Sequence, residues 1–201
     1  AEDLYFHPLA LPMNNLLEAE AFSSVRDEIL MAAEQISSLS APIHLISPPT
    51  IDGSLAIAPL EAALIDSKLP YKRRFTSQSS EYFPSIKVLG NLSDSESFFR
   101  SDPLSISLGT IVVVGLTGYL GTPKRGPLTA VAQAHALAQT ISPSSNRLRR
   151  LRPWALSGNW LNKALETTFD PVFTSIRDFL LSEGSIRVVP ITEVRNPNLE
   201  N

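Results

Sequence analysis

The sequence predicts an α/β fold in which helices pack on both faces of a mostly parallel sheet. Segments of helical periodicity alternate along the chain with short strand-like runs, which is the order that βαβ connections produce. The run "GTIVVV" at 109–114 contains uninterrupted β-branched residues, as is usual for a strand covered on both faces. With 201 residues, 43% of them hydrophobic, the chain can fill one core. We therefore expect one α/β domain over residues 1–190 and a polar tail over 191–201.

The first part of the chain predicts a helix, a strand and a second helix. Apolar residues at spacings of three and four predict a helix from Leu16 to Ser38. The segment "APIHLIS" at 41–47 predicts the first strand. An Ala-rich helix over 54–67 should follow, opened by Asp52 or Gly53.

The middle of the chain is richer in strands. We expect strands at "YKRRF" (71–75) and "PSIKVLG" (84–90). The segment "LSDSESFFRSD" (92–102) is typical of a short acidic helix or a surface loop. After "GTIVVV", the glycine-rich stretch 115–127 fits neither the phosphate-loop nor the dinucleotide pattern, so we expect a long surface loop that could touch a partner.

The last third predicts helices and one closing strand. Helical patterns run from Leu128 to Thr140 and again over 154–169. A further helix should begin with Asp170 as N-cap and Pro171 as its first residue, and should end at Gly184. The segment "IRVVPI" (186–191) predicts the final strand.

Composition excludes several classes of function. The chain has no cysteine, which excludes disulfides, thiolate zinc sites and a cysteine nucleophile. Its net charge of −3 gives no global attraction for nucleic acid, so any such binding would need a local basic patch. No apolar run approaches the roughly 20 residues of a membrane-spanning helix. We expect a cytoplasmic protein that does not contact a membrane.

The turn after the first predicted strand is where an open α/β sheet usually carries its chemistry. Its only ionisable residue is Asp52, which could ligate a divalent metal or cap the helix that follows. A single carboxylate does not hold a catalytic metal, so we favour the helix cap. His7, His44 and His135 are too widely spaced to supply the missing ligands, and we expect no metal and no cofactor.

An arginine cluster follows the helix that is predicted to end at Thr140, and it precedes Trp154. Arginines beside an aromatic residue can bind phosphates and stack a base of single-stranded nucleic acid. The simpler interpretation is the solvated face of a helix, and we expect at most weak binding of single-stranded DNA. The same question applies to the basic strand 71–75. The cluster consists of Arg147, Arg149, Arg150 and Arg152.

Together these elements resemble the N-terminal domain of the DHH phosphoesterase superfamily, which includes the RecJ exonucleases. The first motif of that family, His-x-Asp-x-Asp-Gly, falls on residues 48–53, where only Asp52 and Gly53 match it. A second metal-binding Asp ends a hydrophobic strand in the family, and here Gly115 takes that position. The Asp-His-His run that gives the family its name is absent from the chain. The resemblance covers roughly Ile43 to Gly118.

The resemblance implies a DHH-like domain that has lost its catalytic metals. Degenerate members of the superfamily include a RecJ-like subunit of the archaeal replicative helicase, which binds GINS and supports the MCM helicase. We therefore expect a non-catalytic scaffold in DNA replication. The alternatives are a divergent phosphoesterase or exonuclease and a single-stranded nucleic-acid binding module. The expected partner surface consists of the aromatic residues Tyr82, Phe83, Phe98 and Phe99.

Overall fold

The computed structural model describes residues 14–78, 81–89, 99–164 and 169–189. Two 3₁₀ turns, η1 and η2, precede the first α-helix, and a third, η3, joins α4 to α5. The helices are α1 (Arg26–Ser38), α2 (Ile51–Asp66), α3 (Ala130–Ile141), α4 (Asn146–Leu151), α5 (Ser157–Leu161) and α6 (Pro171–Ser182), and the 3₁₀ turns are η1 (Leu16–Glu18), η2 (Glu20–Phe22) and η3 (Arg152–Leu156). The strands are β1 (Ile43–Ser47), β2 (Tyr71–Phe75), β3 (Ser85–Val88), β4 (Phe99–Ser101), β5 (Leu104–Leu108), β6 (Ile111–Thr117) and β7 (Pro123–Leu128).

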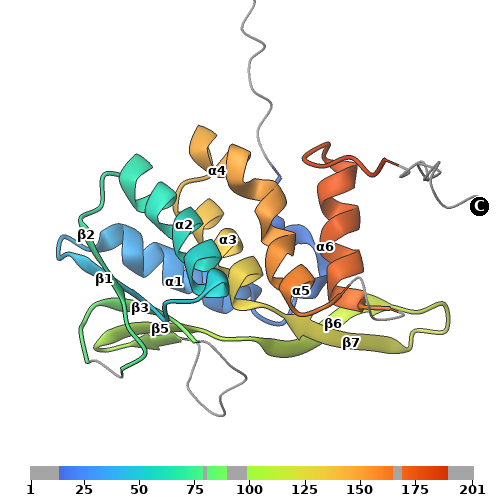
Figure 1. Ribbon diagram of the computed structural model, residues 1–201, viewed down its shortest axis with the longest axis horizontal. Coiled ribbons are helices and arrows are strands. Elements are labelled where there is room, and N and C mark those ends of the chain that lie inside the picture. The colour runs from blue at the N-terminus through green and yellow to red at the C-terminus, as the bar shows by residue number, and fades with distance from the viewer. Residues whose placement is uncertain (1–13, 79–80, 90–98, 165–168, 190–201) are drawn as a thin grey trace, which may run out of the picture.

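The main sheet has five strands in the order β2-β1-β3-β5-β4 (Figure 1). Strand β1 is parallel to β2 and β3, and β3 is parallel to β5. Only β4 is antiparallel, and it forms one edge beside β5. The α/β class with a mostly parallel sheet is therefore confirmed. Strands β1, β2 and β3 and helices α2 and α3 lie within two residues or so of their expected bounds.

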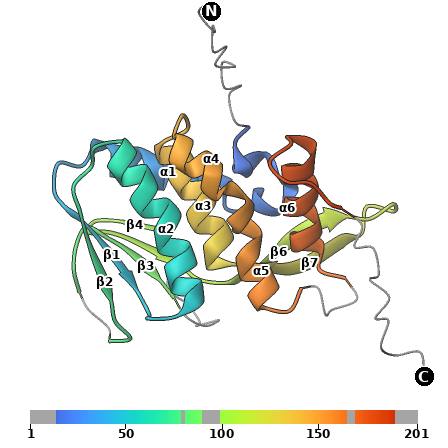
Figure 2. The same cartoon turned by 45° about the horizontal axis from the view of Figure 1, so that its top comes forward.

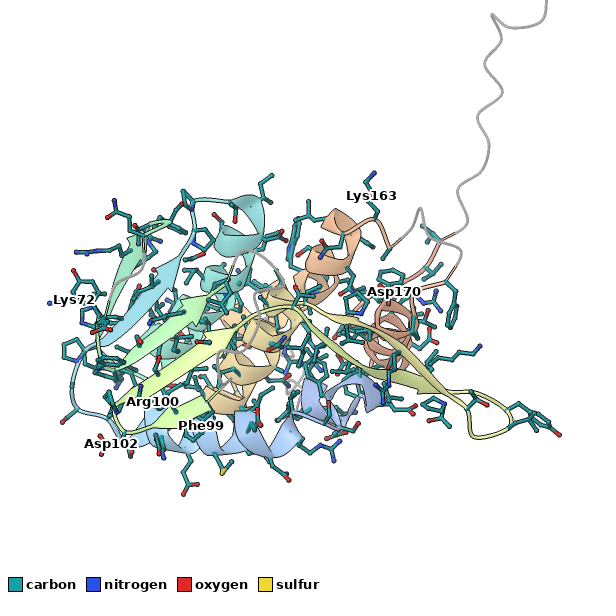
Figure 3. All side chains as sticks on the ribbon, turned by 90° about the horizontal axis from the view of Figure 1, so that it is seen from below. Lys72, Phe99, Arg100, Asp102, Lys163 and Asp170 are labelled. Atoms are coloured by element: carbon teal, nitrogen blue, oxygen red, sulfur yellow. The ribbon has the colours of Figure 1, made fainter. Side chains whose placement is uncertain are left out.

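The described helices gather on one face of this sheet, whereas the sequence led us to expect helices on both. Figure 1 shows the sheet edge-on with the helices above it, and Figure 3, seen from below, shows the strands in front of them. Helices α2 and α3 lie side by side over the sheet (Figure 2). They approach closely because their contact surfaces are rich in alanine, and the core-facing residues of both helices are almost all buried.

The run "GTIVVV" does not join the parallel sheet, and this prediction was wrong. It forms β6, which pairs with β7 in a separate antiparallel ribbon that projects from the domain (Figure 3). The solvent reaches one side of this ribbon, where Val112 is 63% exposed. The other side packs on α6 so closely that a Cβ on Gly115 would lie 2.5 Å from the backbone of Pro171. The expected surface loop at 115–127 is thus mostly strand, with a turn at 118–122.

The first helix and the last strand differ from the predictions, whereas helix α6 agrees with them. The helix expected from Leu16 is broken into η1, η2 and α1. Helix α6 begins as expected, because the Asp170 carboxylate accepts hydrogen bonds from the backbone N–H groups of Val172 and Phe173. It is followed by Gly184 with φ +75°, a conformation that favours glycine. The described part of the expected last strand, residues 186–189, forms no strand, and its remainder lies outside the described residues. No described helix is long and apolar enough to cross a membrane.

Candidate functional site

The turn between β1 and α2 is built around Thr50 and Gly53, and the Asp52 side chain does not cap the helix. Thr50 is the N-cap of α2, and its Oγ1 accepts a hydrogen bond from the Gly53 N–H at 3.1 Å. A Cβ on Gly53 would lie 2.2 Å from Ser47 Oγ and 2.4 Å from the Pro48 carbonyl oxygen, so only glycine fits there. The expectation that Asp52 or Gly53 opens the helix is therefore wrong. The motif turn keeps its shape through residues other than the carboxylate.

Asp52 lies in the first turn of α2 with its carboxyl group partly withdrawn from solvent. Its Oδ1 atom is buried and has no hydrogen-bond partner in the described part of the chain. Burial raises the pKa of Asp52 above its ordinary value, because an ion is poorly solvated there. A lone, half-buried carboxyl group of this kind is a poor helix cap and an incomplete metal site.

In the described part of the chain, the carboxyl ends of β1, β3 and β5 do not supply a donor set for a two-metal centre. Pro48 follows β1, Leu89 follows β3 and Gly109 follows β5, and none of these side chains can ligate a metal. Among the described residues, no group of three or more His, Cys, Asp or Glu side chains is close enough to hold an ion. Two-metal phosphoesterase chemistry needs several carboxylates or imidazoles around both ions. Asp52 with the hydroxyl groups of Ser47 and Thr50 does not fit that requirement.

His135 and His44 contact other residues of the fold and do not form part of a metal site among the described residues. His135 on α3 is buried, its Nε2 atom has no hydrogen-bond partner in the described ranges, and it borders a small apolar hollow of about 130 Å³ between α2 and η3. Burial, helped by the charge of Arg152, lowers the pKa of His135 to about 3. His44 stacks on Tyr82 with ring centroids 4.9 Å apart. Its pKa is lowered by burial and by the charges of Lys72 and Arg74.

The arginine cluster is divided between surface and core. Arg147 pairs with Asp66 at 2.5 Å on the surface, and Arg149 and Arg150 are exposed on α4. Arg152 is buried, however, and its guanidinium binds Glu183, Gln139 Oε1 and the carbonyl oxygen of Asn14. The expectation that Arg152 joins a nucleic-acid surface is therefore wrong.

The expected aromatic partner surface is also divided. Phe99 lies opposite Ile106 on the helix-facing side of the sheet and packs against the core, so it is not available to a partner. Phe98 lies outside the described residues. Tyr82 and Phe83 lie just before β3 on the other side of the sheet, where Phe83 is 39% exposed. Of the described aromatic residues, Tyr82 and Phe83 remain candidates for binding, and the prediction for Phe98 stays a prediction.

The face of the main sheet opposite the described helices brings together residues that are far apart in the sequence. Its central positions Ser85, Ile46 and Ser107 are buried, whereas its outer positions are exposed. The strand registers place one outward row across all five strands and a second row across four of them. Four cations stand in these rows, and Lys72 and Arg100 lie on the two outer strands (Figure 3). We call this surface the open face. The first row is Lys72, His44, Ser85, Ser105 and Arg100, and the second is Arg74, Ile46, Lys87 and Ser107.

Sequence reasoning raised the basic strand 71–75 as a question but could not add Lys87 and Arg100 to it. The alternation of side chains along β2 sends Lys72 and Arg74 to one face and Arg73 to the other, where it pairs with Glu61. The strand order then decides which basic residues share a face.

No family model, curated protein sequence or solved structure matches this chain.

We predict that Thr50, and not Asp52, carries the capping energy of α2. Thr50→Ala should lower the free energy of unfolding by about 1 kcal/mol, the usual cost of a lost N-cap. The pKa of Asp52 is higher in the folded chain than in the unfolded chain. The protonated carboxyl therefore stabilises the fold below the unfolded pKa, and this stabilisation is lost as the pH rises through the folded pKa. Asp52→Asn should therefore be no less stable than the wild type at neutral pH. Urea unfolding of both variants measures this, and a larger loss for Asp52→Asn would return the cap to Asp52.

We also predict that His135 makes the fold sensitive to acid. Its folded pKa of about 3 lies below the unfolded value of 6.5, so the unfolded chain takes up a proton first as the pH falls. Stability should be lost progressively from about pH 6.5 towards pH 3, by on the order of 2 to 3 kcal/mol at about pH 4.5. His135→Gln, which cannot titrate, should lose correspondingly less stability between neutral pH and pH 4.5. Equal losses in the two proteins would show that His135 is not the responsible group.

Proposed function

We propose that this chain is a non-catalytic scaffold subunit with a DHH-phosphoesterase-like domain, and that it acts in the cytoplasm. Its nearest functional analogue would be the RecJ-like subunit of the archaeal replicative helicase, with GINS and MCM as partners. The observation that supports the proposal is the turn after β1. It keeps the glycine that packs against Ser47 and Pro48, while Pro48 and Thr50 stand at two of its three ligand positions.

A scaffold needs a surface that a partner can bury, and the ribbon of β6 and β7 offers one. Tyr119 and Leu120 at its turn are 101% and 85% exposed. The ribbon itself extends away from the helices (Figure 3). Large apolar side chains at such exposure favour a protein contact, because their burial in an interface removes apolar surface from water. We propose that this turn, which we call the ribbon tip, contacts the partner. Phe83 on the open face is the remaining candidate from the expected aromatic surface.

A second candidate function is a divergent phosphoesterase. The observation that favours it is the buried Asp52 Oδ1, which has no hydrogen-bond partner among the described residues and is the kind of atom that a cation can satisfy. The neutral donors around it argue against this alternative, since magnesium and manganese sites draw on several charged oxygens or imidazoles.

We predict that the purified chain binds purified archaeal GINS and that the ribbon tip carries the contact. The double variant Tyr119→Ser, Leu120→Ser should weaken binding at least tenfold in calorimetry while its melting temperature stays close to that of the wild type, because surface substitutions shift stability by about 0.5 kcal/mol or less. The matched control is Leu30→Ser, Met31→Ser on α1, which removes apolar side chains that are 44% and 47% exposed. This control should bind normally.

The same preparation separates the two candidate functions. The scaffold proposal expects no manganese-dependent hydrolysis of single-stranded DNA above the level of an Asp52→Asn control. Hydrolysis that disappears in Asp52→Asn would establish the phosphoesterase. Failure of the wild type to bind GINS would contradict the partner assignment, and equal weakening by the control pair would move the contact away from the ribbon tip.

A further inference from the structure

We infer that the open face of the five-stranded sheet binds single-stranded nucleic acid. This inference does not depend on the scaffold function, because it rests on the surface opposite the helices. Its cations are Lys72 and Arg74 on β2, Lys87 on β3 and Arg100 on β4. Three of them are exposed and Lys87 is half-exposed.

The arrangement of the cations follows from the registers. Lys72 and Arg100 stand at the two ends of the first outward row, and Arg74 and Lys87 stand in the second row with Ile46 between them. Neighbouring strands are about 4.8 Å apart, so the first row spans about 19 Å and the cations of the second row are about 10 Å apart at the backbone. Ser85, Ile46 and Ser107 between them are buried, so the accessible charge lies at Lys72, Arg74 and Arg100, with Lys87 partly exposed. These cations offer separate points of attachment to the phosphates of an extended single strand.

The charge of the open face is of one sign. No outward strand position holds a carboxylate, since the other members of the two rows are histidine, serine and isoleucine. The described acids next to the face are Glu81 and Asp102, which lie in connecting segments and not on strands. By contrast, the basic residue of β2 on the helix side, Arg73, is paired with Glu61 at 2.9 Å. A chain with a net charge of −3 thus places four cations on this face, and no carboxylate stands in the two rows of its described strands, which favours an anionic ligand.

Aromatic side chains hold two of the cations in place. Arg74 donates a hydrogen bond from Nη1 to the Tyr82 hydroxyl at 2.5 Å, and its Cζ lies 4.7 Å from the centre of the Tyr82 ring. Tyr82 is itself stacked on His44. Lys87 Nζ lies 6.0 Å from the centre of the Phe83 ring. Fixed cations lose less conformational entropy when they bind phosphate, so these contacts prepare the face for a ligand.

The aromatic residues also favour nucleic acid over an acidic peptide. Phe83 is partly exposed beside Lys87, and a base can stack on such a ring while the neighbouring cation binds its phosphate. Stacking of this kind requires unpaired bases, which a duplex does not present. The half-exposed Ser105 hydroxyl, between Ser85 and Arg100, can add a hydrogen bond to sugar or phosphate without reading sequence.

The test is fluorescence anisotropy of a labelled oligo(dT) of about 12 nucleotides, a length within the range that single-strand binding domains cover. The triple variant Lys72→Ala, Arg74→Ala, Lys87→Ala should weaken binding at least tenfold and should reduce the slope of log K against log salt concentration by about 2, which is 0.7 for each lost phosphate contact. The matched control is Arg147→Ala, Arg149→Ala, Arg150→Ala on α4, which removes equal charge from another surface. It should change affinity less than twofold.

Two further measurements make the result decisive. Phe83→Ala should weaken oligo(dT) binding several-fold with little change in the salt slope, because it removes stacking and no charge. Circular dichroism should show that each variant melts cooperatively. If the triple variant does not fold, Lys72→Ala alone is measured in its place, because the Lys72 side chain is exposed. Absence of wild-type binding at low salt would overturn the inference. So would an equal loss in the α4 control, or displacement of oligo(dT) by polyglutamate as effectively as by unlabelled oligo(dT).

Discussion

The buried guanidinium of Arg152 is the interaction on which the arrangement of the helices depends. It joins η3 to the Glu183 carboxylate after α6, to Gln139 on α3 and to the backbone of Asn14 before η1. A charge withdrawn from water is tolerated only where such partners surround it, and removal of one partner of a buried pair typically costs about 3 to 5 kcal/mol. This network fixes four distant segments to one another on one side of the main sheet. The charge of Arg152 also adds to burial, the main cause, in lowering the pKa of the neighbouring His135.

One consequence is a sheet whose two faces have different chemistry. The face below α2 and α3 carries Ile43, Leu45, Ile86 and Ile106, all of them buried in the common core. The outward positions of the same strands alternate with these and carry His44, Ile46, Lys87 and serines, and the neighbouring strands β2 and β4 add Lys72, Arg74 and Arg100. Substitutions on one face can therefore change ligand binding with little effect on stability, because neighbouring residues of one strand point to opposite faces of the sheet. The turn between β1 and α2 belongs to neither surface, since it lies at the edge where the strands end.

The sequence correctly predicted those helices and strands that depend on interactions between neighbouring residues. The Asp170-Pro171 start of α6 and the apolar pattern of β1 were correctly predicted because capping and periodicity involve neighbours in the chain. The run "GTIVVV" was misplaced because its β-branched residues fit a buried strand and a ribbon equally well, and its partner strand contains Pro123, Gly126 and Pro127, which are uncommon inside strands. Arg152 was misplaced for a similar reason. Its side chain is buried because it binds Glu183, 31 positions away in the chain, and no local sequence pattern predicts that contact. The open face needed the strand order as well, since Lys87 and Arg100 join Lys72 and Arg74 only when β3, β5 and β4 follow β1 in space.

The most direct test of this account is to locate a bound single strand on the protein. Because the chain has no cysteine, single cysteines can be introduced and labelled with a photoreactive group. Ser105→Cys places the label in the first row of the open face. Ser54→Cys places it on the exposed surface of the first turns of α2, beside the turn that follows β1. The account predicts that irradiation cross-links oligo(dT) to the label at position 105 and not to the label at position 54. Cross-linking at position 54 alone would place nucleic acid at the strand ends and would contradict the assignment of the open face.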